Sequence, residues 1–342
     1  MAADHSLRIV VAGAGSIGCY LGGCLALAGR DVTLLLRPAL ATSIARHGLR
    51  LSDLDGGDRL ATPSTVRLAT DAATALAEAD IVLVTVKSGD TAAMADLIAE
   101  HAPSGATVVS LQNGVSNVEV LLARLGGMAR VVPGMVPFNV VTTRAEGQAP
   151  RFHRATSGAV QIGAGVAGLR DALHTRGVTV AESRYMTGIL WGKLLINLNN
   201  ALNALSGVPL AAELADKRWR RLLARQIEEA LAVLKASGIR PARIEGVAPG
   251  AVPRILRLPD WLFRRVARRM LAIDPEARSS MWEDLERRRP TEIDHLQGAI
   301  LALAAAKAPT LVPLTRRIVA LVKAAEAARA GSPGLAPERI AG

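Results

Sequence analysis

The hydrophobic pattern of the chain changes about halfway along its 342 residues. In the first half, short apolar runs of strand length alternate with helical patterns, which are predicted over residues 91–101 and 117–125. The predicted strands cover residues 9–11, 32–36, 81–86, 107–111, 131–136, 140–143 and 160–162. This alternation predicts an α/β domain with a doubly wound parallel sheet and some antiparallel strands towards its end.

From about residue 185 the apolar positions recur every 3.6 residues, which is typical of helices that bury one face. Long helices are predicted over residues 187–205, 211–237, 292–307 and 312–329, and a shorter amphipathic helix over 261–266. A proline-punctuated connection covers residues 239–260. We therefore predict a first domain over residues 1–184, a mainly α-helical domain over 185–330 and a flexible Gly/Pro/Ala-rich tail over 331–342.

The most informative stretch lies between residues 8 and 37. An apolar run leads into the turn GAGSIG at residues 13–18, and a helical pattern and a second apolar run follow. Gly13 allows a tight turn, Gly15 lets a pyrophosphate approach the backbone, and Gly18 lets the helix pack close to the strand. The N–H groups at the helix N-terminus can bind phosphates. This stretch predicts a Rossmann-type dinucleotide site, and the alternative is a glycine-rich turn with a structural role alone.

The end of the second predicted strand indicates which dinucleotide binds. NAD-binding domains commonly place an Asp or Glu there for the ribose hydroxyls, whereas an Arg accommodates the 2′-phosphate of NADP. The chain reads Leu35-Leu36-Arg37-Pro38, and Asp31 lies at the other end of the strand. Arg37 therefore favours NADPH as the cofactor. The alternative is an ordinary solvated arginine in a loop.

Two further polar residues follow later strands of the same predicted sheet. Lys87 comes after the run at 81–86, and Asn113 comes after the run at 107–111. Ligands of doubly wound sheets bind outside the carboxyl ends of the strands, so both residues are candidates for the site. Lys87 can bind a cofactor phosphate, and Asn113 offers a donor and an acceptor near the nicotinamide. Taken singly, each residue could equally well belong to a turn.

The composition argues against several other classes of protein. The net charge is +11 with 41 Lys and Arg residues, but aromatic residues make up only 3% of the chain and no nucleic-acid-binding motif accompanies the charge. A positive field also suits NADPH and an acidic substrate, so we expect no nucleic-acid partner. No apolar stretch approaches the ~20 residues of a membrane span, so we expect no membrane partner.

The beginning of the chain and its cysteines bear on its location. The N-terminal residues MAADHSLR pass straight into the first strand, so no signal peptide is predicted. The two cysteines, Cys19 and Cys24, lie on different faces of one predicted helix and suit neither a disulfide nor a metal site. We therefore expect a cytoplasmic protein without a bound metal.

The mostly apolar helical pattern over residues 187–205 carries one lysine, Lys193. At about 100° per residue, Asn197 lies about 40° and Asn200 about 20° from Lys193, while Asn199 falls on the far side. Buried polar groups without partners are costly, so this stripe indicates a pocket for an anionic, carbonyl-bearing substrate. A lysine whose pKa is lowered by burial can act as a general acid. The alternative is a lysine that extends its charged end to solvent beside helix-capping asparagines.

A second polar cluster covers residues 279–294, where SSMWEDLE is followed by RPTEID. Pro290 is expected to end one helix and Thr291 to cap the next, with Asp294 in the position of a capping box. Glu292 would then lie in the first helical turn, where a carboxylate is favourable for structural reasons alone.

The order of these motifs resembles the ketopantoate reductase (2-dehydropantoate 2-reductase) family over nearly the whole chain. The motifs that carry the resemblance are GAGSIG, the strand-end Arg37, VKS, LQNG, WGKLLIN, SSMWEDL and RPTEIDHLQG. The family has a Rossmann domain followed by a helical domain. It reduces 2-dehydropantoate to (R)-pantoate with NADPH, on the route to pantothenate and coenzyme A. The resemblance implies this small 2-oxo acid as the substrate and NADPH/NADP+ as the cofactor.

The resemblance also assigns roles to individual residues. Lys193 corresponds to the general acid of the family. The residues expected to bind the substrate are Asn113, Asn197, Asn200, Ser280 and Glu292. The residues expected to bind the cofactor are Gly13, Ala14, Gly15, Ser16, Ile17, Gly18, Arg37, Lys87, Asn113 and Glu292.

The chain departs from the family pattern in two places. Ala201 stands where a second asparagine is usual in the family. Either Asn200 replaces that asparagine, or a one-residue deletion shifts the pattern. The segment 239–274 is also longer and richer in Arg and Pro than a minimal member needs. The alternatives are a reductase of another 2-oxo acid and a noncatalytic NADPH-binding sensor. The amphipathic helices after residue 210 are compatible with a homodimer.

Overall fold

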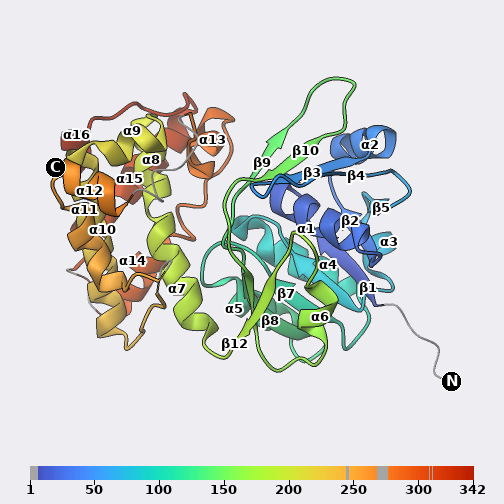
Figure 1. Cartoon of the computed structure of the whole chain (residues 1–342). Helices are drawn as coiled ribbons and strands as arrows, with labels where there is room; N and C mark the ends of the chain where they lie inside the picture. Colours follow the sequence, from blue (N-terminus) through green and yellow to red (C-terminus); the bar gives the residue numbers. More distant parts are fainter. Residues whose placement is uncertain (1–6, 244–245, 268–275, 308, 310) are drawn as a thin grey trace. The chain divides into compact units, whose positions relative to one another are not determined.

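The computed structural model describes residues 7–243, 246–267, 276–307, 309 and 311–342. The chain folds into two compact units, Met1–Met186 and Thr187–Gly342. The first unit contains all the strands of the described chain, and the second contains helices only (Figure 1). The predicted fold class, a doubly wound α/β domain followed by a mainly helical part, is confirmed.

The first unit is built on an eight-stranded sheet in the order β12-β11-β8-β7-β6-β1-β2-β5. Its strands are β1 (Arg8–Ala12), β2 (Asp31–Leu35), β5 (Arg67–Ala69), β6 (Ile81–Val84), β7 (Thr107–Ser110), β8 (Arg130–Met135), β11 (Val160–Gly163) and β12 (Val180–Ser183). From β5 to β8 all neighbours are parallel, whereas β11 pairs antiparallel to β8. Strand order reverses at β1, which lies between β2 and β6. This reversal is where doubly wound sheets bind ligands.

A second, four-stranded sheet has the order β4-β3-β10-β9. It consists of β3 (Leu49–Asp53), β4 (Asp58–Ala61), β9 (Val140–Thr143) and β10 (Arg151–Arg154), of which only the run at 140–143 was predicted. Helix α1 (Ser16–Leu27) packs against both sheets. A Cβ on Gly22 would lie 2.4 Å from Leu34 Cδ2 of the large sheet, and one on Gly23 would lie 2.5 Å from Leu49 Cδ2 of the small sheet. The two glycines therefore let α1 lie close to both sheets.

The remaining helices of the first unit are α2 (Pro38–His47), α3 (Ala72–Leu76), α4 (Thr91–His101), α5 (Asn117–Leu125) and α6 (Leu169–Leu173). Strand β1 contributes to two cores because its side chains alternate between the faces of the sheet. Ile9 and Val11 belong to the core that includes residues of α1, while Val10 and Ala12 belong to the core that includes residues of α3, α4 and α5.

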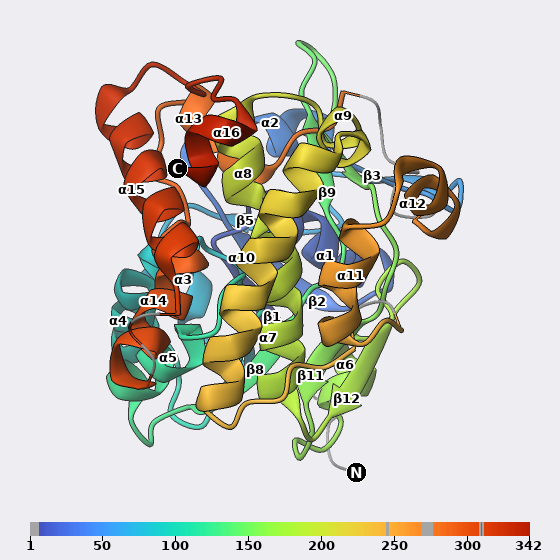
Figure 2. The same ribbon diagram turned by 90° about the vertical axis from the view of Figure 1, so that its left-hand side faces the viewer.

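In the helical unit, shorter helices pack along one long helix, α10 (Lys217–Ala236) (Figure 2). The others are α7 (Met186–Asn197), α8 (Asn199–Ser206), α9 (Leu210–Ala215), α11 (Val252–Leu256), α12 (Asp260–Val266), α13 (Ser280–Glu286), α14 (Gln297–Lys307), α15 (Pro313–Ala328) and α16 (Pro337–Ala341). Helix α10 packs against α8, α9, α11, α14, α15 and α16. No helix among the described residues is long and apolar enough to cross a membrane.

Three predicted helices have different bounds in the structure. The helix predicted over 187–205 is interrupted at Leu198. The helix predicted over 211–237 is two helices, because the Asp216 side chain caps a new helix by accepting a hydrogen bond from Arg218 N at 2.8 Å. Helix α14 begins at Gln297 rather than at residue 292.

The segment 331–342, expected to be a flexible tail, has contacts with the helical unit, and its flexibility stays a prediction. Ser332 Oγ donates to the carbonyl oxygen of Ala204 at 2.8 Å, and Leu335 N donates to that of Leu205 at 2.8 Å. Ile340 in α16 is fully buried. The tail carries few apolar residues, but these bonds and one buried isoleucine attach it to the helical unit.

Arg220 is buried completely at the start of α10 and joins several loops of the helical unit. Its guanidinium donates to the carbonyl oxygens of Leu214, Ala215, Leu256 and Leu258 at 2.9–3.3 Å and to Asp260 Oδ1 at 2.5 Å. The same group lies 4.3 Å from the centre of the Phe263 ring. A buried charge is tolerated here because each of its nitrogens has a partner.

We expect Arg220→Lys to destabilise the helical unit by about 3 kcal/mol, because an ammonium group cannot serve all these acceptors or stack on the ring. The neighbouring Arg218→Lys is the matched control, since Arg218 is exposed and bridges only surface carboxylates. All four tryptophans, Trp191, Trp219, Trp261 and Trp282, lie in the helical unit. Urea unfolding followed by tryptophan fluorescence therefore reports on this unit, and equal small losses in both variants would contradict the assignment.

Candidate active site

The glycine turn between β1 and α1 has the geometry of a dinucleotide-binding turn. Gly13 has a φ of +80°, and a Cβ on it would lie 2.1 Å from Val86 Cγ1. The amide groups of Gly13 and Ala14 donate to the carbonyl oxygen of Leu35 at 3.2 and 2.9 Å, which attaches the turn to β2. Only glycine fits at Gly13, both for its backbone conformation and for the space around it.

The other two glycines of the motif differ in their surroundings. A Cβ on Gly18 would lie 2.5 Å from Thr85 Oγ1 and 2.9 Å from Val11 Cγ1, so Gly18 allows α1 to approach the sheet closely. A Cβ on Gly15 would meet only Gly13 O, at 3.9 Å, so the space beside Gly15 is open. Gly15 caps α1 without a side chain, and the first turn of α1 carries no acidic residue. These features fit a phosphate group at the helix N-terminus.

Arg37, Lys87 and Asn113 all lie at the edge of the large sheet where β1 ends in the glycine turn. Arg37 is exposed at the start of α2, just after β2. Lys87 and Asn113 follow β6 and β7, which pair in parallel with β1 and with each other. Parallel pairing explains the common edge, because the carboxyl ends of parallel strands point the same way.

Hydrogen bonds join the loop of Lys87 to the loop of Asn113. Ser88 Oγ donates to the carbonyl oxygen of Asn113 at 2.7 Å, and Asn117 Nδ2 donates to the same oxygen at 2.6 Å. The structure therefore brings together two residues that lie 26 positions apart in the chain.

In the helical unit, Lys193 and Asn197 lie on one helix, α7, four residues apart. The side chain of Lys193 is half-buried, and Asn197 is buried. Asn200 belongs to the next helix, α8, because α7 ends at Asn197. The backbone keeps its helical path between the two helices, because Leu198 has a φ of −57° and a ψ of −28° and its N–H donates to the carbonyl oxygen of Leu194 at 3.0 Å. The place of Asn200 in the stripe stays a prediction.

Two buried side chains, Gln297 and Asn203, form hydrogen bonds at the junction of α7 and α8 and within α8. Gln297 Nε2 donates to the carbonyl oxygen of Leu198 at 2.9 Å, and Gln297 is fully buried at the start of α14. Asn203 Oδ1 accepts from Ser279 N at 2.8 Å, and Ser279 Oγ donates to the carbonyl oxygen of Asn200 at 3.0 Å. Sequence reasoning missed Gln297 and Asn203, because nothing in the sequence shows which backbone groups they meet.

Ser280 and Glu292 lie in the two segments that these bonds attach to α8 and to Leu198. Ser280 is exposed as the first residue of α13, whose N-cap is Ser279. Glu292 is half-buried in a turn before α14, rather than in the first turn of that helix. The predicted capping box is wrong, because Thr291 N donates to Glu326 Oε1 at 2.7 Å and Asp294 pairs with Lys323. Tertiary partners from α15 thus replace the local ones.

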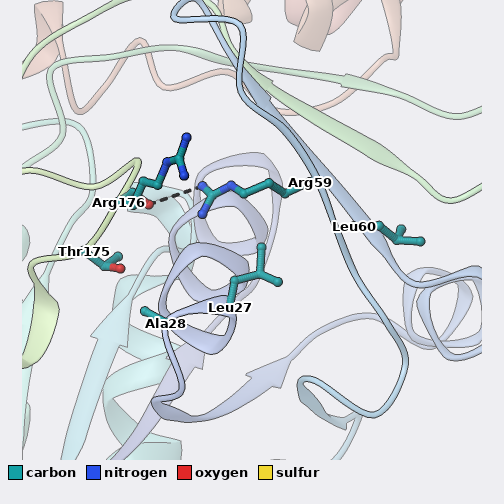
Figure 3. Close-up of a pocket in the computed structure, with 6 residues that line it drawn as sticks. All are labelled: Leu27, Ala28, Arg59, Leu60, Thr175 and Arg176. Atoms are coloured by element: carbon teal, nitrogen blue, oxygen red, sulfur yellow. Dashed lines mark hydrogen bonds between the residues drawn. The ribbon is translucent and has the colours of Figure 1, made fainter.

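The first unit also contains a cavity that is separate from its glycine turn (Figure 3). It lies at the C-terminal end of α1, about 18 Å along the helix from the glycine turn at 1.5 Å per residue. Its lining residues are Leu27, Ala28, Arg59, Leu60, Thr175 and Arg176. None of the predicted site residues lines this cavity.

Both cysteines are free and buried. Burial raises the pKa of Cys19 to about 12, and its thiol donates to the carbonyl oxygen of Ala14 at 3.3 Å. Arg59 Nη2 lies 3.6 Å from Cys24 Sγ. Cys19 is a neutral core residue at neutral pH.

Glu213 is a buried carboxyl group beneath α8 that sequence reasoning also missed. Asn203 Nδ2 and Ser206 Oγ donate to Glu213 Oε2 at 2.7 and 3.3 Å. Burial nevertheless raises the pKa of Glu213 to about 7, because these hydrogen bonds offset only part of the cost of removing the charge from water.

Comparison with known proteins places both units in one family. The family model "Ketopantoate reductase PanE/ApbA" matches residues 9–166, and its C-terminal counterpart matches residues 186–326. The chain is 31% identical to the 2-dehydropantoate 2-reductase of Halobacterium salinarum over 333 residues, covering 94% of this chain and 99% of that protein.

Solved structures show the same relation. A PanE/ApbA family ketopantoate reductase from Ralstonia eutropha JMP134 is 30% identical, with a TM-score of 0.77 over 94% of this chain and 99% of that one. D-mandelate dehydrogenase in a ternary structure with NADH and anilino(oxo)acetate is 22% identical, with a TM-score of 0.72 over 94% of this chain and 99% of that one, which shows a common fold.

The fold, the glycine turn and these similarities define an NAD(P)-dependent oxidoreductase with a small-molecule substrate. The chain belongs to the ketopantoate reductase family PanE/ApbA.

The raised pKa of Glu213 predicts that the helical unit loses stability as the pH rises. The unfolded chain releases this proton near pH 4.5 and the folded chain near pH 7, so the folded state holds the extra proton between these values. The contribution is fully present below pH 4.5 and is lost by about pH 7, and it amounts to about 3 kcal/mol. Glu213→Gln is neutral at every pH and should be more stable than the wild type at pH 8.

Urea unfolding at pH 5 and pH 8, followed by tryptophan fluorescence, measures this difference. Glu338→Gln serves as the control, because Glu338 is exposed and pairs with the exposed Arg218. A pH dependence that persists unchanged in Glu213→Gln would show that other groups cause it.

Proposed function

We propose that the enzyme reduces 2-dehydropantoate to (R)-pantoate with NADPH, on the route to pantothenate and coenzyme A. The observation that carries the proposal is Lys193, a half-buried lysine four residues before the buried Asn197 on an otherwise apolar helix. A relative that is 31% identical over nearly its whole length is named 2-dehydropantoate 2-reductase, which supports the substrate.

The first unit would hold the cofactor. Gly15 and the uncapped start of α1 fit the pyrophosphate, and Arg37 fits the 2′-phosphate of NADPH. Lys87 and Asn113 lie across the strand-order reversal from Arg37, which suits the nicotinamide half. The remaining proposed contacts are Gly13, Ala14, Ser16, Ile17, Gly18 and Glu292. The bound nicotinamide supplies a hydride to the ketone carbon.

Lys193 would act on the ketone oxygen. Its ammonium group donates a hydrogen bond to the carbonyl oxygen, which stabilises the negative charge that develops there, and then transfers the proton to it. An apolar helix suits this role, because charge stabilisation is stronger where water is excluded. The product hydroxyl therefore carries a proton that came from Lys193.

The polar residues of the helical unit would bind the rest of the substrate. Asn197, Asn200 and Ser280 offer hydrogen-bond donors for the carboxylate, and Glu292 can accept from the substrate hydroxyl. The bonds from Ser279 and Gln297 fix the segments that carry them, which reduces the cost of ordering a binding site. Asn113 would contact both cofactor and substrate.

A second candidate is the reduction of another branched or aromatic 2-oxo acid. Ala201 favours it, since it stands where the family pattern usually has a second asparagine, and Ala201 is fully buried in α8. Initial rates with 2-dehydropantoate, 2-oxoisovalerate and phenylglyoxylate distinguish the two reactions. A noncatalytic sensor would bind NADPH and oxidise it with none of the three.

We expect Lys193→Ala to lower kcat with NADPH and 2-dehydropantoate by about 100-fold or more, because it removes the proton donor. Lys193→Arg keeps the positive charge but cannot release a proton near neutral pH, so it separates charge stabilisation from proton transfer. The Kd for NADPH should change little in either variant. The rate of NADPH oxidation at 340 nm measures kcat.

Lys235→Ala is the control, since Lys235 is an exposed lysine on another helix of the same unit, in the last turn of α10. Near-normal turnover in Lys193→Ala would sink the assignment of Lys193 as the general acid. Near-normal turnover in Lys193→Arg alone would show that the charge matters and the proton does not.

We expect Arg37→Gln to raise the KM for NADPH by about 10- to 100-fold, since it removes charge-assisted hydrogen bonds to the 2′-phosphate. The KM for NADH should stay nearly the same, because NADH has no such phosphate. Arg46→Gln is the matched control: it makes the same charge change in the last turn of α2, at the end of the helix far from Arg37. Equal losses with both cofactors would contradict the role of Arg37.

A further inference from the structure

A connected set of buried polar side chains lies beneath the loops of Lys87 and Asn113. The set comprises Ser88, Thr91, Ser110, Gln112 and Asn117, none of which is more than 6% exposed. They come from β7, the loop after it, the loop after β6 and the starts of α4 and α5. Buried polar groups in a domain of this kind require partners, and these side chains supply them to one another.

The hydrogen bonds run in one direction and end at Asn113. Ser110 Oγ donates to Gln112 Oε1 at 3.2 Å, and Gln112 Nε2 donates to Thr91 Oγ1 at 2.7 Å. Thr91 Oγ1 lies 2.9 Å from Asn117 Oδ1 and 2.8 Å from the carbonyl oxygen of Ser88, and these two acceptors share its single proton. Asn117 Nδ2 donates to the carbonyl oxygen of Asn113 at 2.6 Å. Bonds aligned head to tail in a low-dielectric interior strengthen one another.

The last hydrogen bonds of this series fix the backbone at Asn113. The carbonyl oxygen of Asn113 accepts from both Asn117 and Ser88, so both of its lone pairs are used. Gly114 follows with a φ of +92°, a conformation that leaves the peptide to be held by its hydrogen bonds rather than by side-chain sterics. Ser88 directly follows Lys87, so its hydrogen bond also links this peptide to the loop of Lys87.

We propose that Asn117 and Thr91 are positioning residues for the nicotinamide half of the cofactor. They fix the Asn113 peptide and the start of the loop after Lys87 without contacting the ligand. The site of their action follows from the sheet order, since their loops follow β6 and β7, on the opposite side of β1 from β2 and Arg37. The adenosine half would therefore be independent of them. This inference rests on the proposed cofactor site.

The decisive variant is Asn117→Asp. The carboxylate has nearly the same shape as the amide and can still accept from Thr91, but it has no N–H group for the Asn113 carbonyl and repels it instead. We expect the Kd for NADPH to rise by about tenfold and kcat to fall by about tenfold or more, since a small displacement of a reacting group is costly. The Kd for adenosine 2′,5′-bisphosphate, which occupies only the adenosine half, should stay within about twofold.

Two variants of Thr91 provide an independent test, one that removes the hydroxyl group and one that keeps it. Thr91→Val keeps the shape and removes the hydroxyl, so it should give the same split between NADPH and adenosine 2′,5′-bisphosphate. Thr91→Ser keeps the hydroxyl and should restore NADPH binding to near the wild-type value. Thr91 decides the question if Asn117→Asp does not fold.

Ile98→Ala is the control for a purely structural effect. It creates a cavity at a fully buried position of α4, the same helix as Thr91, and leaves every member of the polar set in place. A similar rise in the NADPH Kd in this variant, or an equal loss of both ligands in Asn117→Asp, would overturn the proposal. So would a failure of Thr91→Ser to restore binding.

These binding measurements do not depend on turnover. If the wild type binds NADPH but reduces none of the three 2-oxo acids, the proposed reaction is wrong, while the ratio of the two Kd values still decides the role of Asn117. If the wild type reduces 2-dehydropantoate and Asn117→Asp leaves that ratio unchanged, the reaction stands and the positioning role is wrong.

Discussion

The close approach of α1 to its neighbouring strands is the constraint on which the first unit depends. Gly18, Gly22 and Gly23 each face side-chain atoms that a Cβ would meet within about 2.5 Å, from Thr85, Leu34 and Leu49 respectively. The glycines let the helix approach both sheets closely, and its buried side chains such as Tyr20, Leu21 and Leu25 pack in the core between them. Its start is fixed at the end of β1, where Gly13 and Ala14 bond to the carbonyl oxygen of Leu35.

The helical unit is held together by a different feature, the long-range hydrogen bonds to the junction of α7 and α8. The helical path continues through this junction, because Leu198 has helical φ and ψ angles and its N–H donates to the carbonyl oxygen of Leu194 at 3.0 Å. Gln297 supplies a donor for Leu198 from about a hundred residues away, and Ser279 and Asn203 tie the start of α13 to α8. The segments that carry Asn197, Ser280 and Glu292 are thus attached to one point of the fold.

The sequence allowed the large sheet to be predicted because its central strands are covered on both faces and are therefore continuous apolar runs. The small sheet was missed for the opposite reason. Strand β4 exposes Asp58 and half of Leu60, and β10 begins and ends with arginines, so neither reads as an apolar run. The interruption at Leu198 has no Pro or Gly to announce it. The hydrogen bond from Gln297 to Leu198 is a tertiary contact that periodicity does not reveal, and the place of Asn200 in the stripe stays a prediction.

The same difference separates the candidate site residues that the sequence predicted from the supporting residues that it did not. A backbone that must adopt a positive φ or approach a helix closely leaves a glycine in the sequence, so the turn at Gly13 and Gly18 is visible there. A lysine in an apolar helix can likewise be recognised from the sequence, since a charged residue interrupts the apolar pattern. Asn117, Thr91, Asn203 and Gln297 are polar residues at helix ends or within helices, where capping accounts for them just as well. Only their partners, which are backbone groups and side chains of distant segments, separate a helix cap from a support for the candidate site.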